Sequence, residues 1–186
     1  MLKFYKFVFF ILISATLVSC GKKAEQQNVN TDPNASFSWK ESITAKDIPD
    51  FPVKGFIDGR EIKFEYVNFE YWRGSNDNVF NFSDRTPKNK CGFIENDNAF
   101  HLTKLGKAFE EGEFLKNAFS MNLDGITGDY HTTVNDNMQK FSPAWNCALV
   151  ITEMDDDFVK GKIAMCFKDE KKSWVAGTFT AVRCNN

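Results

Sequence analysis

The chain has 186 residues, of which 42% are hydrophobic and 26% are charged, and its formal net charge at pH 7 is −2. This length fits one ordinary domain with an extension, and it is large enough to bury a hydrophobic core. The slightly acidic balance argues against nucleic acid as a partner, because binding to phosphates requires a surplus of Lys and Arg.

The first 19 residues have the pattern of a secretory signal peptide. Lys3 and Lys6 supply positive charge, and an uncharged, largely apolar run from Phe7 to Val18 follows. An apolar run of about a dozen residues matches a signal peptide and is shorter than the roughly 20 residues that span a bilayer as a helix. We therefore expect residues 1–19 to be removed. The remaining chain has 21 Lys plus Arg against 25 Asp plus Glu, a net charge of −4.

The signal ends in Leu17-Val18-Ser19-Cys20, where small residues precede a cysteine. This stretch resembles the lipobox of bacterial lipoproteins. The resemblance implies that the Cys20 thiol carries a diacylglycerol and that the freed amino group is acylated as well. Two or three acyl chains anchor a protein durably, at about 0.8 kcal/mol per buried methylene. The alternative is a plain signal peptide in which Cys20 is coincidental.

The resemblance also implies a location. In enteric lipoproteins an Asp directly after the lipidated cysteine favours retention in the inner membrane, and Gly21 occupies that position here. We therefore expect a protein of the cell envelope, anchored in the outer membrane of a Gram-negative cell by the lipid on Cys20.

Residues 20–46 predict a flexible polar tether, and residues 47–186 a single β domain. Phe37 and Trp39 are the only aromatic residues in the polar segment. A flexible coil of this length has an end-to-end distance of roughly 25 to 30 Å, which holds a domain clear of the headgroups. Phe37 and Trp39 alternate around Ser38, so an edge strand, or packing of this segment against the domain, is the open alternative.

The domain begins with a clear hairpin signal in residues 53–66. Asp58-Gly59 lies between two alternating runs, and both loop positions of a type I′ turn need positive φ. A two-residue loop places Gly55 opposite Ile62. Beyond Tyr66 the apolar phase slips by one residue, which indicates a β-bulge or a strand that crosses between sheets.

The middle of the chain contains shorter strand candidates at residues 79–82 and 100–105. Residues 106–116 are ambiguous, and at most one short helix is expected there because Gly112 disfavours a long one. Residues 115–123 alternate again and predict a strand. The aromatic side chains Tyr66, Phe69, Tyr71 and Trp72 are interpreted as core, with a ligand-binding stripe as the alternative.

The last forty residues predict a three-stranded meander over residues 147–153, 159–167 and 173–183. Many short alternating runs separated by turns favour an all-β fold, either an antiparallel β-sandwich or a partly open β-barrel, with at most one short helix. Residues 53–59 and 175–179 resemble segments of small β-rich bacterial lipoproteins of unassigned function. That resemblance implies no catalytic residue.

The chain has five cysteines. Lipidation of Cys20 leaves four, an even number in an exported chain, which predicts two disulfides. A turn centred between residues 156 and 157 places Cys147 opposite Cys166, and Cys91 and Cys184 then form the other pair. The other pairings stay open, because a register error of one or two residues moves Cys166 away from Cys147. Reduced thiols are the alternative.

The residues from Asp124 to His131, with Asp136 beyond them, form the most polar constellation and are expected to be a loop. The spacing of an EF-hand is absent. A zinc site is not expected, since His101 and His131 are isolated in the sequence and no Cys-x-x-Cys occurs. No Gly-x-Ser-x-Gly motif is present. We therefore predict no catalytic residue, metal or cofactor.

These observations favour a non-enzymatic envelope lipoprotein that binds a protein, glycan or small ligand through its loops or an aromatic face. An assembly or structural lipoprotein differs from this only in its partner. The alternative class is a hydrolase whose site assembles only in three dimensions, because hydrolytic triads form from residues distant in sequence.

Overall fold

The computed structural model describes residues 36–184, so the predicted signal peptide, Cys20 and most of the predicted tether lie outside the described residues. Within residues 36–184, no helix is long and apolar enough to cross a membrane.

The described chain contains one short 3-10 helix, η1 (Ala45–Asp47). The rest of the regular structure is β: β1 (Lys54–Ile57), β2 (Arg60–Lys63), β3 (Tyr66–Trp72), β4 (Asp77–Ser83), β5 (Phe100–Lys104), β6 (Gly112–Lys116), β7 (Ile126–Val134), β8 (Asn137–Phe141), β9 (Trp145–Met154), β10 (Phe158–Phe167) and β11 (Trp174–Cys184).

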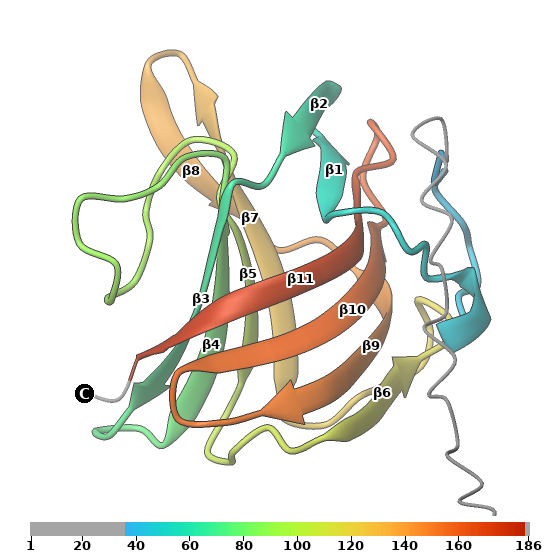
Figure 1. Ribbon diagram of the computed structural model, residues 1–186. Coiled ribbons are helices and arrows are strands. Elements are labelled where there is room, and N and C mark those ends of the chain that lie inside the picture. The colour runs from blue at the N-terminus through green and yellow to red at the C-terminus, as the bar shows by residue number, and fades with distance from the viewer. Residues whose placement is uncertain (1–35, 185–186) are drawn as a thin grey trace, which may run out of the picture.

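Nine strands form one curled sheet in the order β6-β9-β10-β11-β3-β4-β5-β7-β8 (Figure 1). The two end strands, β6 and β8, are not paired with each other in this order, so the barrel is partly open. The prediction of an all-β fold is confirmed. One strand pair departs from the antiparallel pattern, because β11 runs parallel to β3.

The predicted hairpin is β1–β2, and it pairs Gly55 with Ile62 as expected. The turn residues Asp58 and Gly59 have φ of 50° and 82°, which a type I′ turn requires. No bulge interrupts β3, which pairs with β4 continuously from Tyr66 to Trp72, so the phase slip lies slightly earlier than predicted, in the gap between β2 and β3. The hairpin lies off the main strand order and pairs with β11 through β1, so the chain crosses into the main sheet at residues 64–65.

The larger of two hydrophobic clusters forms the core on one face of the curled sheet and is rich in phenylalanine; the smaller one contains Phe37, Ile43 and Cys166. Phe80, Phe82 and Phe100 are fully buried, and the Phe179 ring lies 5.3 Å from both Phe80 and Phe82. Edge-on ring pairs at this distance add to the burial energy of the rings. The inner side of the half-barrel is therefore filled by side chains from β4, β5 and β11.

The folded domain begins earlier than the predicted boundary at residue 46. Phe37 is buried, its ring lies 5.1 Å from that of Trp174, and Trp39 Nε1 donates a hydrogen bond of 2.7 Å to the Phe167 carbonyl. Residues 36–46 thus pack against the domain, which is the alternative that the spacing of Phe37 and Trp39 left open.

The middle segment contains a strand where the sequence allows one short helix. β6 pairs with β9, and Gly112 at its start has φ of 140°, a backbone conformation that favours glycine. The predicted strand over residues 115–123 is wrong beyond Lys116. The amide of Met121 donates to the Ala118 carbonyl at 3.0 Å, so the chain turns there. Alternation alone did not distinguish this turn from a strand.

The meander β9–β10–β11 is confirmed, but the predicted Cys147–Cys166 disulfide is wrong. The turn is centred as expected, since Lys160 pairs with Glu153. A β-bulge next to Gly161 then shifts the register by one residue, so Cys147 pairs with Met165 and Cys166 with Asn146. Because neighbouring residues of a strand point to opposite faces, the two thiols lie in different clusters, and both are free and buried.

Candidate functional site

A row of polar side chains crosses four strands on the face of the sheet opposite the core. Asn68 of β3 pairs with Asn81 of β4, Asn81 with His101 of β5, and His101 with Asp129 of β7. We call these four residues the polar row. All four side chains are buried, although the alternation of the strands turns them away from the phenylalanine core.

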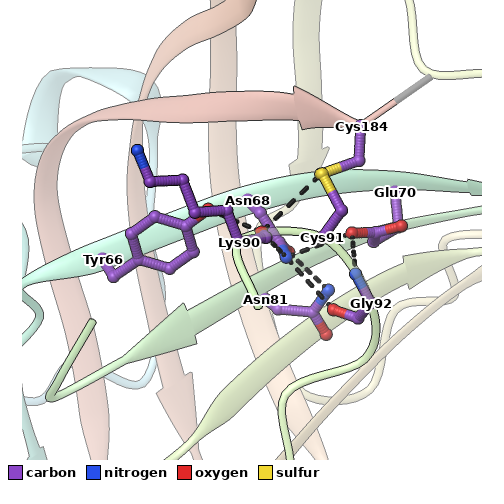
Figure 2. The surroundings of a disulfide bond; sticks show 8 residues. All are labelled: Tyr66, Asn68, Glu70, Asn81, Lys90, Cys91, Gly92 and Cys184. Atoms are coloured by element: carbon purple, nitrogen blue, oxygen red, sulfur yellow. Dashed lines mark hydrogen bonds between the residues drawn. A yellow bond between two sulfur atoms is a disulfide. The ribbon is translucent and has the colours of Figure 1, made fainter. Parts of the chain in front are cut away.

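The polar row is buried because the β4–β5 connection, residues 84–99, lies over it; we call this segment the covering loop. Asn68 Nδ2 donates to the carbonyls of Lys90 (3.0 Å) and Gly92 (3.1 Å), and it lies 3.1 Å from Glu70 Oε1. The Gly92 amide donates to Glu70 Oε1 at 2.6 Å. Figure 2 shows these side chains pointing from the sheet towards the backbone of the loop. The row thus satisfies backbone groups that the loop would otherwise bury unpaired.

A disulfide between Cys91 and Cys184 joins the covering loop to the end of β11 (Figure 2). This is the second of the two predicted pairings. Tyr66 adds a further attachment, because its hydroxyl donates to the Lys90 carbonyl at 2.6 Å. The loop is therefore held at three neighbouring residues, 90 to 92, by β3 and β11.

At the far end of the polar row, the side chains of His101 and Asp129 lie at ion-pair distance. His101 Nε2 lies 2.8 Å from the Ile94 carbonyl, which only accepts, so Nε2 carries a proton and donates it. His101 Nδ1 lies 3.0 Å from Asp129 Oδ1. The second carboxylate oxygen of Asp129 lies 3.0 Å from Lys140 Nζ on β8. Burial alone would raise the pKa of the Asp129 carboxyl, but His101 and Lys140 outweigh it and the pKa is lowered.

His131 lies beside this pair, two residues after Asp129 on β7. Its ring centroid is 4.8 Å from that of His101. The side chain is buried, and its Nδ1 has no hydrogen-bond partner. Burial lowers the pKa of His131, and the neighbouring charge of His101 lowers it further, which favours a neutral ring with one free lone pair.

Phe93 of the covering loop closes the site from the solvent side. Its ring stacks on His101 with a centroid distance of 4.4 Å and lies edge-on to His131 at 6.3 Å. Trp72 also packs edge-on against Phe93, at 5.5 Å. Phe93 remains 38% exposed, so it is the outermost ring of this stack.

The structure corrects two expectations about this region. His101 and His131 are isolated in the sequence but adjacent in space, so their separation along the chain does not argue against a metal site. The segment expected as a polar loop is mostly strand, because β7 begins at Ile126. One ligand atom from each of His101, Asp129 and His131 lies within 4.8 Å of the others.

The aromatic residues of β3 divide between the two faces. Phe69 is in the core, whereas Tyr66 and Trp72 contact the covering loop. Tyr71 is half-exposed, and its hydroxyl donates to Asn76 Oδ1 at 2.7 Å. The core interpretation therefore holds for Phe69, and the structure does not bring the four rings into one stripe.

Comparison with known proteins adds no relative: no family model, curated protein or solved structure matches this chain.

Proposed function

We propose that the protein is an envelope lipoprotein, anchored through the lipid on Cys20, whose β domain is a non-enzymatic binding or structural module. The observation that carries the proposal is the lipobox-like stretch Leu17-Val18-Ser19-Cys20 after an apolar run. A short connection between the lipid and the domain fits the proposal. Phe37, which packs against Trp174, lies 17 residues after Cys20, and a segment of that length spans at most about 60 Å.

The packing of the domain favours binding on its exterior. The side of the half-barrel that would hold a small ligand is filled with phenylalanine, including Phe80, Phe82 and Phe100. On the exterior, a groove of about 360 Å³ lies between the N-terminal segment and the β1–β2 hairpin. Its lining combines aromatic rings with cationic and anionic side chains: Ser36, Phe37, Lys54, Gly55, Glu61, Ile62, Lys63 and Trp174. This mixture suits an envelope protein or a glycan.

Metabolic labelling with an alkyne analogue of palmitate tests the anchor. The wild-type chain should be labelled and should sediment with outer membranes, whereas Cys20→Ser should lose both properties. Cys147→Ser, which alters a buried thiol of the domain, is the matched control and should keep the label. Labelling of Cys20→Ser would contradict the proposal.

Site-specific photocrosslinking in intact cells tests the binding surface. A photoreactive residue at Glu61, in the groove, should capture an envelope protein or glycan. The same residue at Asn137, exposed on the edge strand β8, should not. Equal capture from both positions would mean that the groove is not the binding surface.

A hydrolase remains the second candidate, because His101 and Asp129 form a histidine–carboxylate pair. Such a pair activates a nucleophile when the other ring nitrogen faces a hydroxyl or thiol. Here that nitrogen faces the Ile94 carbonyl. Among the described residues, neither imidazole ring accepts a hydrogen bond from a Ser, Thr or Cys side chain. Turnover of an ester or amide substrate that is lost in His101→Gln would favour the hydrolase.

A further inference from the structure

We propose that His101, Asp129 and His131 bind a divalent transition-metal ion, with zinc as the representative ion. The three residues come from the adjacent strands β5 and β7, and their ligand atoms lie within 4.8 Å of one another. Two imidazoles and one carboxylate are a ligand set that Zn²⁺ accepts, at about 2.0 to 2.2 Å from each ligand atom. This proposal does not depend on the lipid anchor.

The hydrogen bonds of His101 orient it for this role. Its Nε2–H donates to the Ile94 carbonyl, which fixes the tautomer and leaves Nδ1 directed at the Asp129 carboxylate. A ring nitrogen that donates to a backbone carbonyl is the usual outer support of a metal-ligating histidine. Because Nδ1 and Oδ1 would otherwise meet lone pair to lone pair, a cation must lie between them, either a proton or a metal ion.

His131 supplies an independent observation. Its side chain is only 4% exposed, and its Nδ1 is buried without a hydrogen-bond partner. A buried polar atom of this kind needs an explanation, since nearly all buried polar atoms in native proteins are paired. A metal ion held between the two imidazoles and the carboxylate gives the His131 ring a partner that the described residues do not supply.

The surroundings limit access to the site. Phe93 stacks over His101 and shields it from bulk water. Lys140 Nζ contacts Asp129 Oδ2 and competes with a metal ion, but the Lys140 side chain is 56% exposed on the edge strand β8. It can turn into water when a metal ion binds. The displaced proton between His101 and Asp129 leaves to solvent at the same time.

The chain contains only two histidines, which makes the test direct. The full chain carrying Cys20→Ser, purified in detergent without a polyhistidine tag, is titrated with Zn²⁺ and followed by calorimetry and by the ¹⁵N resonances of the imidazoles. We expect one ion per chain at micromolar affinity or tighter, with nitrogen shifts in both rings. His131→Gln should weaken binding by at least tenfold, and Lys140→Gln should strengthen it about tenfold by removing a competing charge.

Three results would overturn the proposal: no binding at millimolar Zn²⁺, undiminished binding in a folded His131→Gln variant, or binding that leaves either imidazole unshifted. The last two would indicate an adventitious surface site. If His131→Gln does not fold, the imidazole resonances of the unsubstituted site decide the question. Tighter binding in Lys140→Gln would then place the ion next to Asp129, because Lys140 contacts that carboxylate.

Discussion

Cys91 and Cys184 lie 93 residues apart in the sequence, yet they are joined by a disulfide with their Cα atoms 5.6 Å apart. The bond fastens the covering loop to the last strand of the sheet, beside Asn68 and Glu70. The burial of the polar row, and with it the environment of His101 and His131, depends on that loop staying in place.

Removing this disulfide should loosen the covering loop before the rest of the domain. In the loop-entropy model, closing a chain segment of this length contributes about 4 to 5 kcal/mol. The double variant Cys91→Ala/Cys184→Ala should therefore lose up to that much free energy of unfolding, and amide exchange in residues 84–99 should accelerate most. Because a lower free energy of unfolding accelerates exchange throughout the domain, acceleration in residues 84–99 that does not exceed that in β9 and β10 would contradict local loosening of the loop.

Glu70 should make stability depend on pH. Burial raises the pKa of its carboxyl, and the hydrogen bond from Gly92 opposes this only in part. A carboxyl whose pKa is higher in the folded than in the unfolded state binds its proton more tightly when folded. Its stabilising contribution is therefore present below the unfolded pKa and is lost as pH rises through the folded pKa.

We therefore expect Glu70→Gln to gain stability relative to wild type as pH rises from about 4.5. Chemical denaturation at several pH values measures the difference, with exposed Glu65→Gln as the control for loss of one negative charge. A difference between wild type and Glu70→Gln that does not change with pH would contradict this account.

The two free thiols should be inert while the protein is folded. Burial raises the pKa of Cys166 to about 12 and also raises that of Cys147. A thiol reagent at pH 8 should label neither until the chain unfolds, and peptide mapping without reduction should find Cys91 linked to Cys184. A peptide linking Cys147 to Cys166 would show that the register shift in β9–β10 is wrong.

Gly177 should be intolerant of any side chain. Its φ is 129°, and an added Cβ would lie 2.6 Å from the Phe51 carbonyl oxygen and 2.8 Å from the Val53 nitrogen. Both neighbours are backbone atoms, so Gly177→Ala should cost more than about 2 kcal/mol. Gly74→Ala, where an added Cβ meets nothing within 4 Å, should change the unfolding free energy by less than about 0.5 kcal/mol.

Local patterns predicted the parts of the fold that depend on neighbouring residues. The Asp58-Gly59 turn sets the register of the first hairpin, and charged turns separate the strands of the final meander. The bulge beside Gly161 leaves little mark in the sequence, because both faces of β9 and β10 are buried beyond it and no alternation of polar and apolar residues shows the shift. The resulting shift in register by one residue is why the predicted Cys147–Cys166 disulfide is wrong.

The candidate site could not be predicted in the same way. His101 and Asp129 are 28 residues apart and meet only because β5 and β7 pair, with β6 placed at the opposite end of the sheet. Asn68 lies between Val67 and Phe69, and Asn81 between Phe80 and Phe82; such alternation indicates side chains facing water. They are buried by the covering loop, whose position depends on long-range contacts with β3 and β11.

Mass spectrometry of the N-terminal peptide from the protein isolated from its native envelope tests the central claim most directly. We predict a peptide that begins at Cys20 and carries a diacylglycerol together with an amide-linked acyl chain. A peptide that begins at Met1, or at any residue other than Cys20, would contradict the lipid anchor.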